Sequence, residues 1–96
     1  MVQAIENRSW VQCTPLGPSE PGPAPGWSSL PIRIERTAAL PGWPDLLAEA
    51  AGREYTAIVP PALVEEFAAQ PLWTAEAEVV GPHRIALKAV ASPQDR

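Results

Sequence analysis

The segment Arg53–Phe67 constrains the fold most tightly, because its hydrophobic period changes at two consecutive prolines. Residues 53–59 are largely aromatic, β-branched or small, which is typical of a strand, and both faces are apolar, which predicts an interior position in a sheet. Pro60 cannot donate a hydrogen bond to a sheet, whereas Pro61 suits the first position of a helix. We therefore predict a strand over 53–59 that passes directly into a helix over 61–70.

Alternating apolar and polar residues predict four further strands, at 9–13, 30–36, 72–80 and 84–91. Between the second and third strands, Pro44 suits a first helical position and Gly52 a left-handed cap, so we predict a short helix over 44–51. The expected fold is mainly β with two short helices. Five strands with a helix between the third and fourth indicate a small, partly closed, OB-like barrel in a single domain, 1–96, with 92–96 as a tail.

The last two strands are expected to form a hairpin whose register follows from its loop. A three-residue loop at Gly81–His83 sets Val79 opposite Ile85, so that apolar residues share one face. The same register sets Glu76 opposite Lys88, which predicts a cross-strand ion pair.

Residues 14–31 contain six prolines and three glycines. Proline cannot donate to a sheet and glycine loses extra backbone entropy on ordering, so we predict a long Pro/Gly-rich loop with polyproline II character. Pro18 and Pro21 belong to PxxP spacings, a pattern that docks in aromatic grooves, although the flanks lack the basic residue that such ligands commonly carry.

Two tryptophans join Pro18 and Pro21 as the candidate binding residues. Trp27 lies within the Pro/Gly-rich loop, and Trp43 follows a Pro-Gly turn. An aromatic residue at such a place either anchors its loop to the body of the protein or forms a contact surface, because aromatics are enriched at interaction hot spots. Both interpretations stay open from the sequence alone.

The residues that could carry catalysis are few. Cys13, the one cysteine, could act as a nucleophile if His83, the one histidine, lay beside it, but nothing in the sequence places them together. A single cysteine is commonly a small core residue. One Cys and one His fall short of a zinc site, and no glycine-rich phosphate cradle is present. We expect no catalytic residues, no metal and no cofactor.

The formal charge of −4 disfavours nucleic acid as a partner, because phosphate binding needs a basic stripe. No signal peptide, polybasic segment or apolar stretch of about 20 residues indicates a membrane. We predict a soluble, cytoplasmic protein.

The function that these observations favour is a non-catalytic protein-interaction or accessory-subunit module. Its partner would be another protein chain or a second copy of itself. A small-molecule-binding or catalytic domain that uses Cys13 and His83 is the alternative. A barrel that binds single-stranded nucleic acid ranks third, because the acidic balance works against it.

Overall fold

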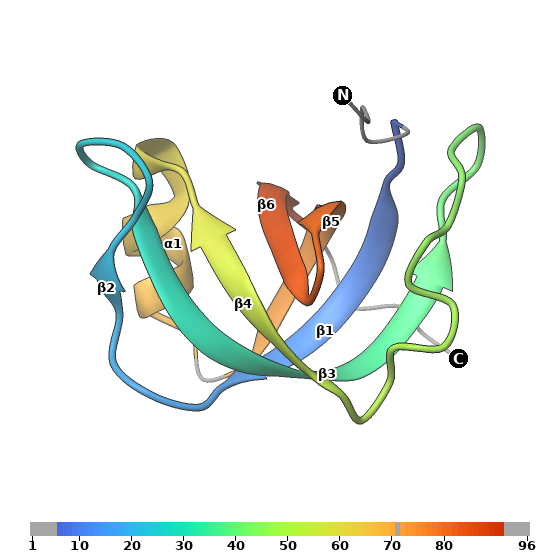
Figure 1. Cartoon of the computed structure of the whole chain (residues 1–96), viewed down its shortest axis with the longest axis horizontal. Helices are drawn as coiled ribbons and strands as arrows, with labels where there is room; N and C mark the ends of the chain where they lie inside the picture. Colours follow the sequence, from blue (N-terminus) through green and yellow to red (C-terminus); the bar gives the residue numbers. More distant parts are fainter. Residues whose placement is uncertain (1–5, 71, 92–96) are drawn as a thin grey trace.

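The computed structural model describes residues 6–70 and 72–91, which form a β-sheet closed into a barrel (Figure 1). The strands among these residues are β1 (Ser9–Pro15), β2 (Glu20–Pro21), β3 (Ser28–Ala39), β4 (Glu54–Val59), β5 (Trp73–Gly81) and β6 (Arg84–Val90). Five of them close in the order β1-β3-β4-β6-β5, with β5 pairing back to β1, while β2 pairs with β3 at the edge. The neighbouring strands are antiparallel except β4 and β6, which are parallel. The prediction of a mainly β barrel is confirmed.

A single short helical segment lies among the described residues. The 3-10 turn η1 (Pro61–Leu63) continues directly into α1 (Val64–Ala68). The predicted change from strand to helix at Pro60 and Pro61 is therefore confirmed. Phe67 is the buried residue of α1 and packs into the core of the barrel.

The prediction of a helix over 44–51 is wrong, because the chain there forms turns. The carboxylate of Asp45 accepts hydrogen bonds from the backbone N–H of Leu47 (3.0 Å) and from the hydroxyl of Ser9 (2.5 Å). An Asp side chain that bonds the backbone two residues ahead stabilises a turn and competes with helix formation. Gly52 has φ +86°, so the left-handed position expected for it is present.

The core is formed by alternate residues of the strands, which point into the barrel as period-2 patterning requires. Its strand members are Val11, Cys13, Leu30, Ile32, Ile34, Ala57, Val59, Trp73, Ala75, Ala77, Ile85 and Leu87. The two ends of the barrel are closed by different segments, because β4 begins just after the 44–52 turns and ends just before η1. Leu47 and Ala50 fill one end, and Phe67 fills the other.

The side chain of Asn7 extends the ladder between β1 and β5 beyond the first residue of β1. Its Oδ1 accepts a hydrogen bond from the backbone N–H of Val79 (2.8 Å), and its Nδ2 donates to the carbonyl oxygen of Val79 (3.2 Å). Asn7 is fully buried, so these bonds satisfy polar groups that would otherwise lack water.

The hairpin register predicted at the end of the chain is confirmed for the central pair, since Val79 lies opposite Ile85. The turn itself is tighter than expected, because Gly81 lies opposite Arg84 with two residues between them. An irregularity at Val80 supplies the extra residue, and this bulge preserves the inward orientation of both strands.

The prediction of an ion pair between Glu76 and Lys88 is wrong. A second irregularity sets Glu76 opposite Ala89 instead. Glu76 pairs with Arg8 at 3.2 Å, and Lys88 pairs with Glu78 at 3.6 Å. These pairs lie at the surface, where each stabilises the fold by about 1 kcal/mol or less.

Neighbouring leucines test whether the 44–52 turns close one end of the barrel. Leu47 is fully buried, whereas Leu46 is 48% exposed. We expect Leu47→Ala to lower the free energy of unfolding by about 2–5 kcal/mol, because it opens a cavity in the core. Leu46→Ala should change it by roughly 0.5 kcal/mol or less. Urea denaturation of both variants measures this, and equal effects would contradict the assignment of Leu47 as the plug.

Candidate functional site

The Pro/Gly-rich stretch 14–31 has more regular structure than a single long loop. β1 continues to Pro15, and Pro21 of β2 pairs with Ser28 at the start of β3. The backbone N–H of Gly22 donates to the carbonyl oxygen of Trp27 (2.9 Å), which closes the hairpin. A sequence this rich in proline still forms a hairpin because β2 lies at an edge, where fewer donors are needed.

Trp27 lies in this hairpin and is half-buried. A Cβ atom at Gly22 would lie 2.8 Å from the Cβ of Trp27, so only glycine allows the two arms of the hairpin to approach this closely. Trp27 therefore packs against the opposite arm of the hairpin and is also partly exposed at its surface. Pro18 and Pro21 lie nearby and are exposed.

Trp43 lies at the opposite end of the molecule, because Trp27 precedes the first residue of β3 and Trp43 follows its last. The guanidinium carbon of Arg8 lies 4.8 Å from the centre of the Trp43 ring, a cation–π contact. Trp43 nevertheless remains 39% exposed. The structure thus does not bring the two predicted binding tryptophans into one surface.

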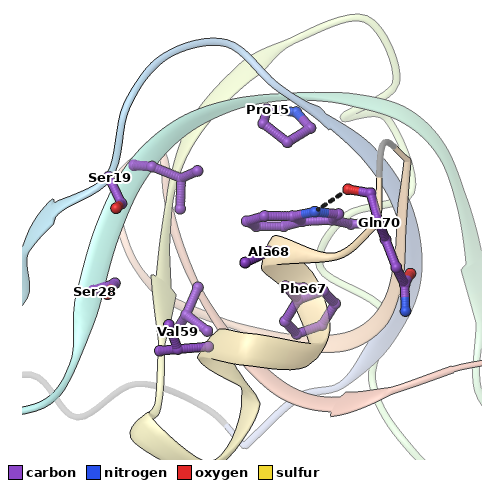
Figure 2. Close-up of a pocket in the computed structure, with 10 residues that line it drawn as sticks. Pro15, Ser19, Ser28, Val59, Phe67, Ala68 and Gln70 are labelled. Carbon is purple, nitrogen blue, oxygen red and sulfur yellow. Dashed lines mark hydrogen bonds between the residues drawn. The ribbon is translucent and has the colours of Figure 1, made fainter.

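A cavity of about 230 Å³ lies between the barrel and α1. Pro15, Ser19 and Ser28 line it from the strand side, and Phe67 and Ala68 line it from the helix side (Figure 2). The remaining lining residues are Leu30, Val59, Val64, Gln70 and Trp73. Ser19 and Ala68 are exposed, so the cavity opens to the surface. Its wall is mostly hydrocarbon, with two hydroxyl groups and one amide.

Two aromatic rings form the floor of this cavity. The ring centres of Phe67 and Trp73 lie 4.8 Å apart and the planes are tilted by 39°. The indole N–H of Trp73 donates to the backbone carbonyl of Gln70 at 3.0 Å, shown as the dashed line in Figure 2. This bond and the ring contact orient the indole at the floor of the cavity. Trp73 is also a core residue, because its side chain is only 5% exposed.

Cys13 and His83 lie at opposite ends of β5. Cys13 is paired with Trp73, the first residue of β5, whereas His83 follows Gly81, the last. Nine residues of strand span roughly 25–30 Å. The structure therefore does not bring together the nucleophile and base considered from the sequence.

The surroundings of Cys13 suit a core residue. The side chain is fully buried. Burial, reinforced by the negative charge of Glu35, raises the pKa of the Cys13 thiol to about 12. The thiol stays protonated at neutral pH, which removes the nucleophilic thiolate.

His83 is an exposed turn residue. Its backbone has φ +54°, and its carbonyl oxygen accepts a hydrogen bond from the backbone N–H of Thr56 (2.8 Å). The imidazole ring centre lies 5.4 Å from that of Tyr55. These contacts tie the β5–β6 turn to β4.

Over residues 6–70 and 72–91, no group of three or more His, Cys, Asp or Glu side chains could hold a metal ion. Within the same ranges, no helix has the length and apolar character needed to cross a membrane.

Comparisons of this chain with protein-family models, with curated proteins and with solved structures found no match.

The raised pKa of Cys13 predicts how stability depends on pH. The unfolded thiol ionises near its ordinary value of 9.0, whereas the folded thiol keeps its proton to about 12. The stabilisation is complete below pH 9 and is lost as pH rises towards 12, at up to about 1.4 kcal/mol per pH unit.

Urea denaturation from about pH 8 to about pH 11 measures this effect as the difference between the wild type and Cys13→Ala. Taking the difference cancels the other groups that titrate in the same range. A difference that does not change with pH would mean that Cys13 ionises equally well in the folded protein.

Proposed function

We propose that this protein is a non-catalytic interaction module in which one end of an OB-like barrel binds a bulky apolar side chain of another polypeptide. The observation that carries the proposal is the surface-accessible apolar cavity between the barrel and α1. Apolar cavities with a few polar groups at defined positions are the usual form of a binding site.

The size of the cavity favours one side chain over a larger ligand. Sites for drug-sized molecules and cofactors occupy about 300–1,000 Å³, whereas an apolar cavity of about 150 Å³ accommodates benzene. A volume of about 230 Å³ lies between these limits. It has room for one aromatic or large aliphatic side chain, the type of residue that anchors protein interfaces.

Exposed leucines next to the cavity supply the surrounding contact surface. Leu16 and Leu72 are 40% and 42% exposed, and each directly adjoins a lining residue, Pro15 and Trp73 respectively. Because Cys13 pairs with Trp73 in the antiparallel β1–β5 ladder, both leucines lie beyond the same end of that ladder. A pocket surrounded by apolar contacts that exclude water is the usual arrangement of an interaction hot spot.

The OB-like assignment is part of this proposal. It is supported by the closed order β1-β3-β4-β6-β5, by the parallel pairing of β4 with β6, and by a helix between β4 and β5. A five-stranded Greek-key barrel of this kind serves many kinds of ligand, so the fold alone does not select one.

The competing functions have less support. Nucleic-acid binding by such a barrel relies on exposed aromatic rings and a basic groove. Trp10 is only 2% exposed, the exposed Trp43 lies at the opposite end of the molecule from Trp27, and the formal charge is −4. A catalytic use of Cys13 with His83 would require the two ends of β5 to meet.

A capped amino acid tests the proposal directly. We expect N-acetyl-phenylalaninamide, titrated into ¹⁵N-labelled protein, to shift the indole N–H signal of Trp73 and the backbone signals of Ser28 and Gln70. Affinity in the millimolar range is expected for a single anchor side chain. N-acetyl-glycinamide, which has no side chain, should leave these signals in place.

Ala68→Trp introduces a large side chain at a lining position and should abolish these shifts. Ala62→Trp is the matched control, because Ala62 is exposed on η1 and does not line the cavity. Shifts that survive in Ala68→Trp, or that lie away from the cavity in the wild type, would contradict the proposed site.

A further inference from the structure

The polar lining residues of the cavity lie at its opening, and the inner lining residues are apolar. Ser19 is exposed, and Ser28 and Gln70 are half-buried. The four lining residues that are at most 6% exposed are Leu30, Val59, Phe67 and Trp73. A ligand group that passes the opening therefore meets aliphatic carbon and two aromatic rings.

The two lining residues of β3 show how the opening and the interior are separated. Ser28 and Leu30 are two residues apart on one strand, so they share the inward face and lie about 6.5 Å apart along it. Ser28 pairs with Val59, the last residue of β4, whereas Leu30 pairs with Ala57, farther from that end of the barrel. Leu30 thus lines the inner end of the cavity, and Ser28 lies nearer to the opening.

The one side-chain hydrogen-bonding group among the inner residues is already used. Leu30, Val59 and Phe67 carry no such group, and the indole N–H of Trp73 donates to the backbone carbonyl of Gln70 at 3.0 Å (Figure 2). A hydroxyl or N–H group brought to the inner end of the cavity would lose its water and meet no free side-chain partner there. Burying a polar group in this way lowers affinity.

A side chain that enters this cavity does so with its tip first. The volume of about 230 Å³ is filled by one large side chain, so the main chain that carries it stays at the opening. The tip of the occupant then lies against Leu30, Phe67 and Trp73. The chemistry of that tip therefore decides which residues the cavity accepts.

On these grounds we infer that the residue recognised in the partner is phenylalanine, and that tyrosine is discriminated against. The inference rests on the proposed function, since it names the side chain that the cavity takes from another polypeptide. A phenyl ring adds to the contact between Phe67 and Trp73, and aromatic pairs contribute more than their buried area alone. Leucine lacks this contribution, whereas tyrosine and tryptophan each carry a hydrogen-bond donor into the apolar interior.

Three capped amino acids that differ only at the tip of the ring test the inference. They are N-acetyl-phenylalaninamide, N-acetyl-tyrosinamide and N-acetyl-4-methylphenylalaninamide. We expect the tyrosine compound to bind about tenfold more weakly than the phenylalanine compound. Apolar sites reject an added hydroxyl by up to about a hundredfold, and this cavity is open to water on one side. Shifts of the Trp73 indole N–H and of the Ser28 backbone N–H in ¹⁵N-labelled protein measure binding.

The 4-methyl compound separates polarity from size. A methyl group occupies about the same space as a hydroxyl group but needs no hydrogen bond, so this compound should bind at least as tightly as the phenylalanine compound. Weak binding of both ring-substituted compounds would show that the cavity lacks room at the tip of the ring, and would overturn polarity as the basis of selection.

Ser28→Ala tests whether a hydroxyl near the opening reaches the phenol of tyrosine. We expect the ratio of the two affinities to stay unchanged, because the tip of the ring lies beyond Ser28. Ser29→Ala is the matched control, since Ser29 is the next residue of β3 and does not line the cavity. Loss of tyrosine affinity in Ser28→Ala alone, with phenylalanine affinity unchanged, would overturn the inference.

The remaining outcomes distinguish the inference from the proposed function. Equal affinity for the phenylalanine and tyrosine compounds, or tighter binding of tyrosine, overturns the inference and leaves the proposed function standing. Tighter binding of N-acetyl-leucinamide than of the phenylalanine compound does the same. If none of these compounds shifts the signals at the cavity, the proposed function itself is overturned.

Discussion

The pairing of β1 with both β3 and β5 is the interaction on which the rest of the structure depends. If β1 paired only with β3, β1 and β5 would be the edges of an open sheet; with both pairings, the five long strands enclose one core. Closure removes the exposed backbone groups of an edge and turns alternate residues of every strand inward. The side chain of Asn7 continues this closure past the end of β1 by bonding both backbone groups of Val79.

A closed barrel leaves two ends to be covered, and the chain covers them unequally. The connection between β3 and β4 is long enough to fold back, and it places Leu47 and Ala50 in the core. The connection between β4 and β5 forms only η1 and the five residues of α1. Phe67 of this segment fills part of that end, and the cavity lies beside it. The cavity is the space that this short helix leaves.

The features that follow from local sequence were predictable. Two-residue periodicity located four of the five long strands, residue types located the fifth, and the consecutive prolines located the start of the helix. The register of the last hairpin at its central pair was predictable too. Val79 and Ile85 lie opposite each other, so both apolar side chains point to the same face. Each of these depends on residues close together in the chain.

Three features that depend on distant residues were not predictable. Pro44, Asp45 and Gly52 favour a helix locally, but Ser9, 36 residues away, bonds the Asp45 carboxylate in a turn. The irregularity between Glu76 and Ala77, which sets Glu76 opposite Ala89 instead of Lys88, leaves no pattern in the sequence. The cavity was missed for a related reason: Val64, Phe67 and Trp73 have the spacing of core residues, and nothing local shows that the space between them is unfilled.

The proline-rich hairpin acquires a role from its position beside the cavity. Its tip and α1 lie at the same end of the molecule (Figure 1). At that tip Gly26 has φ +84°, and a Cβ atom there would lie 3.1 Å from the ring of Pro61 at the start of η1. The close contact between Gly26 and Pro61 therefore sets the distance between the hairpin and the helical segment.

This packing holds the two walls of the cavity in place relative to each other. Ser19 and Ser28 belong to the segments that enter and leave the hairpin, and Val64 and Ala68 belong to α1. Prolines reduce the freedom of the unfolded chain and limit the conformations open to the hairpin. A site whose walls are fixed before binding loses less entropy when it takes up a side chain. If the cavity binds a side chain as proposed, the prolines of the hairpin contribute by holding one of its walls in place.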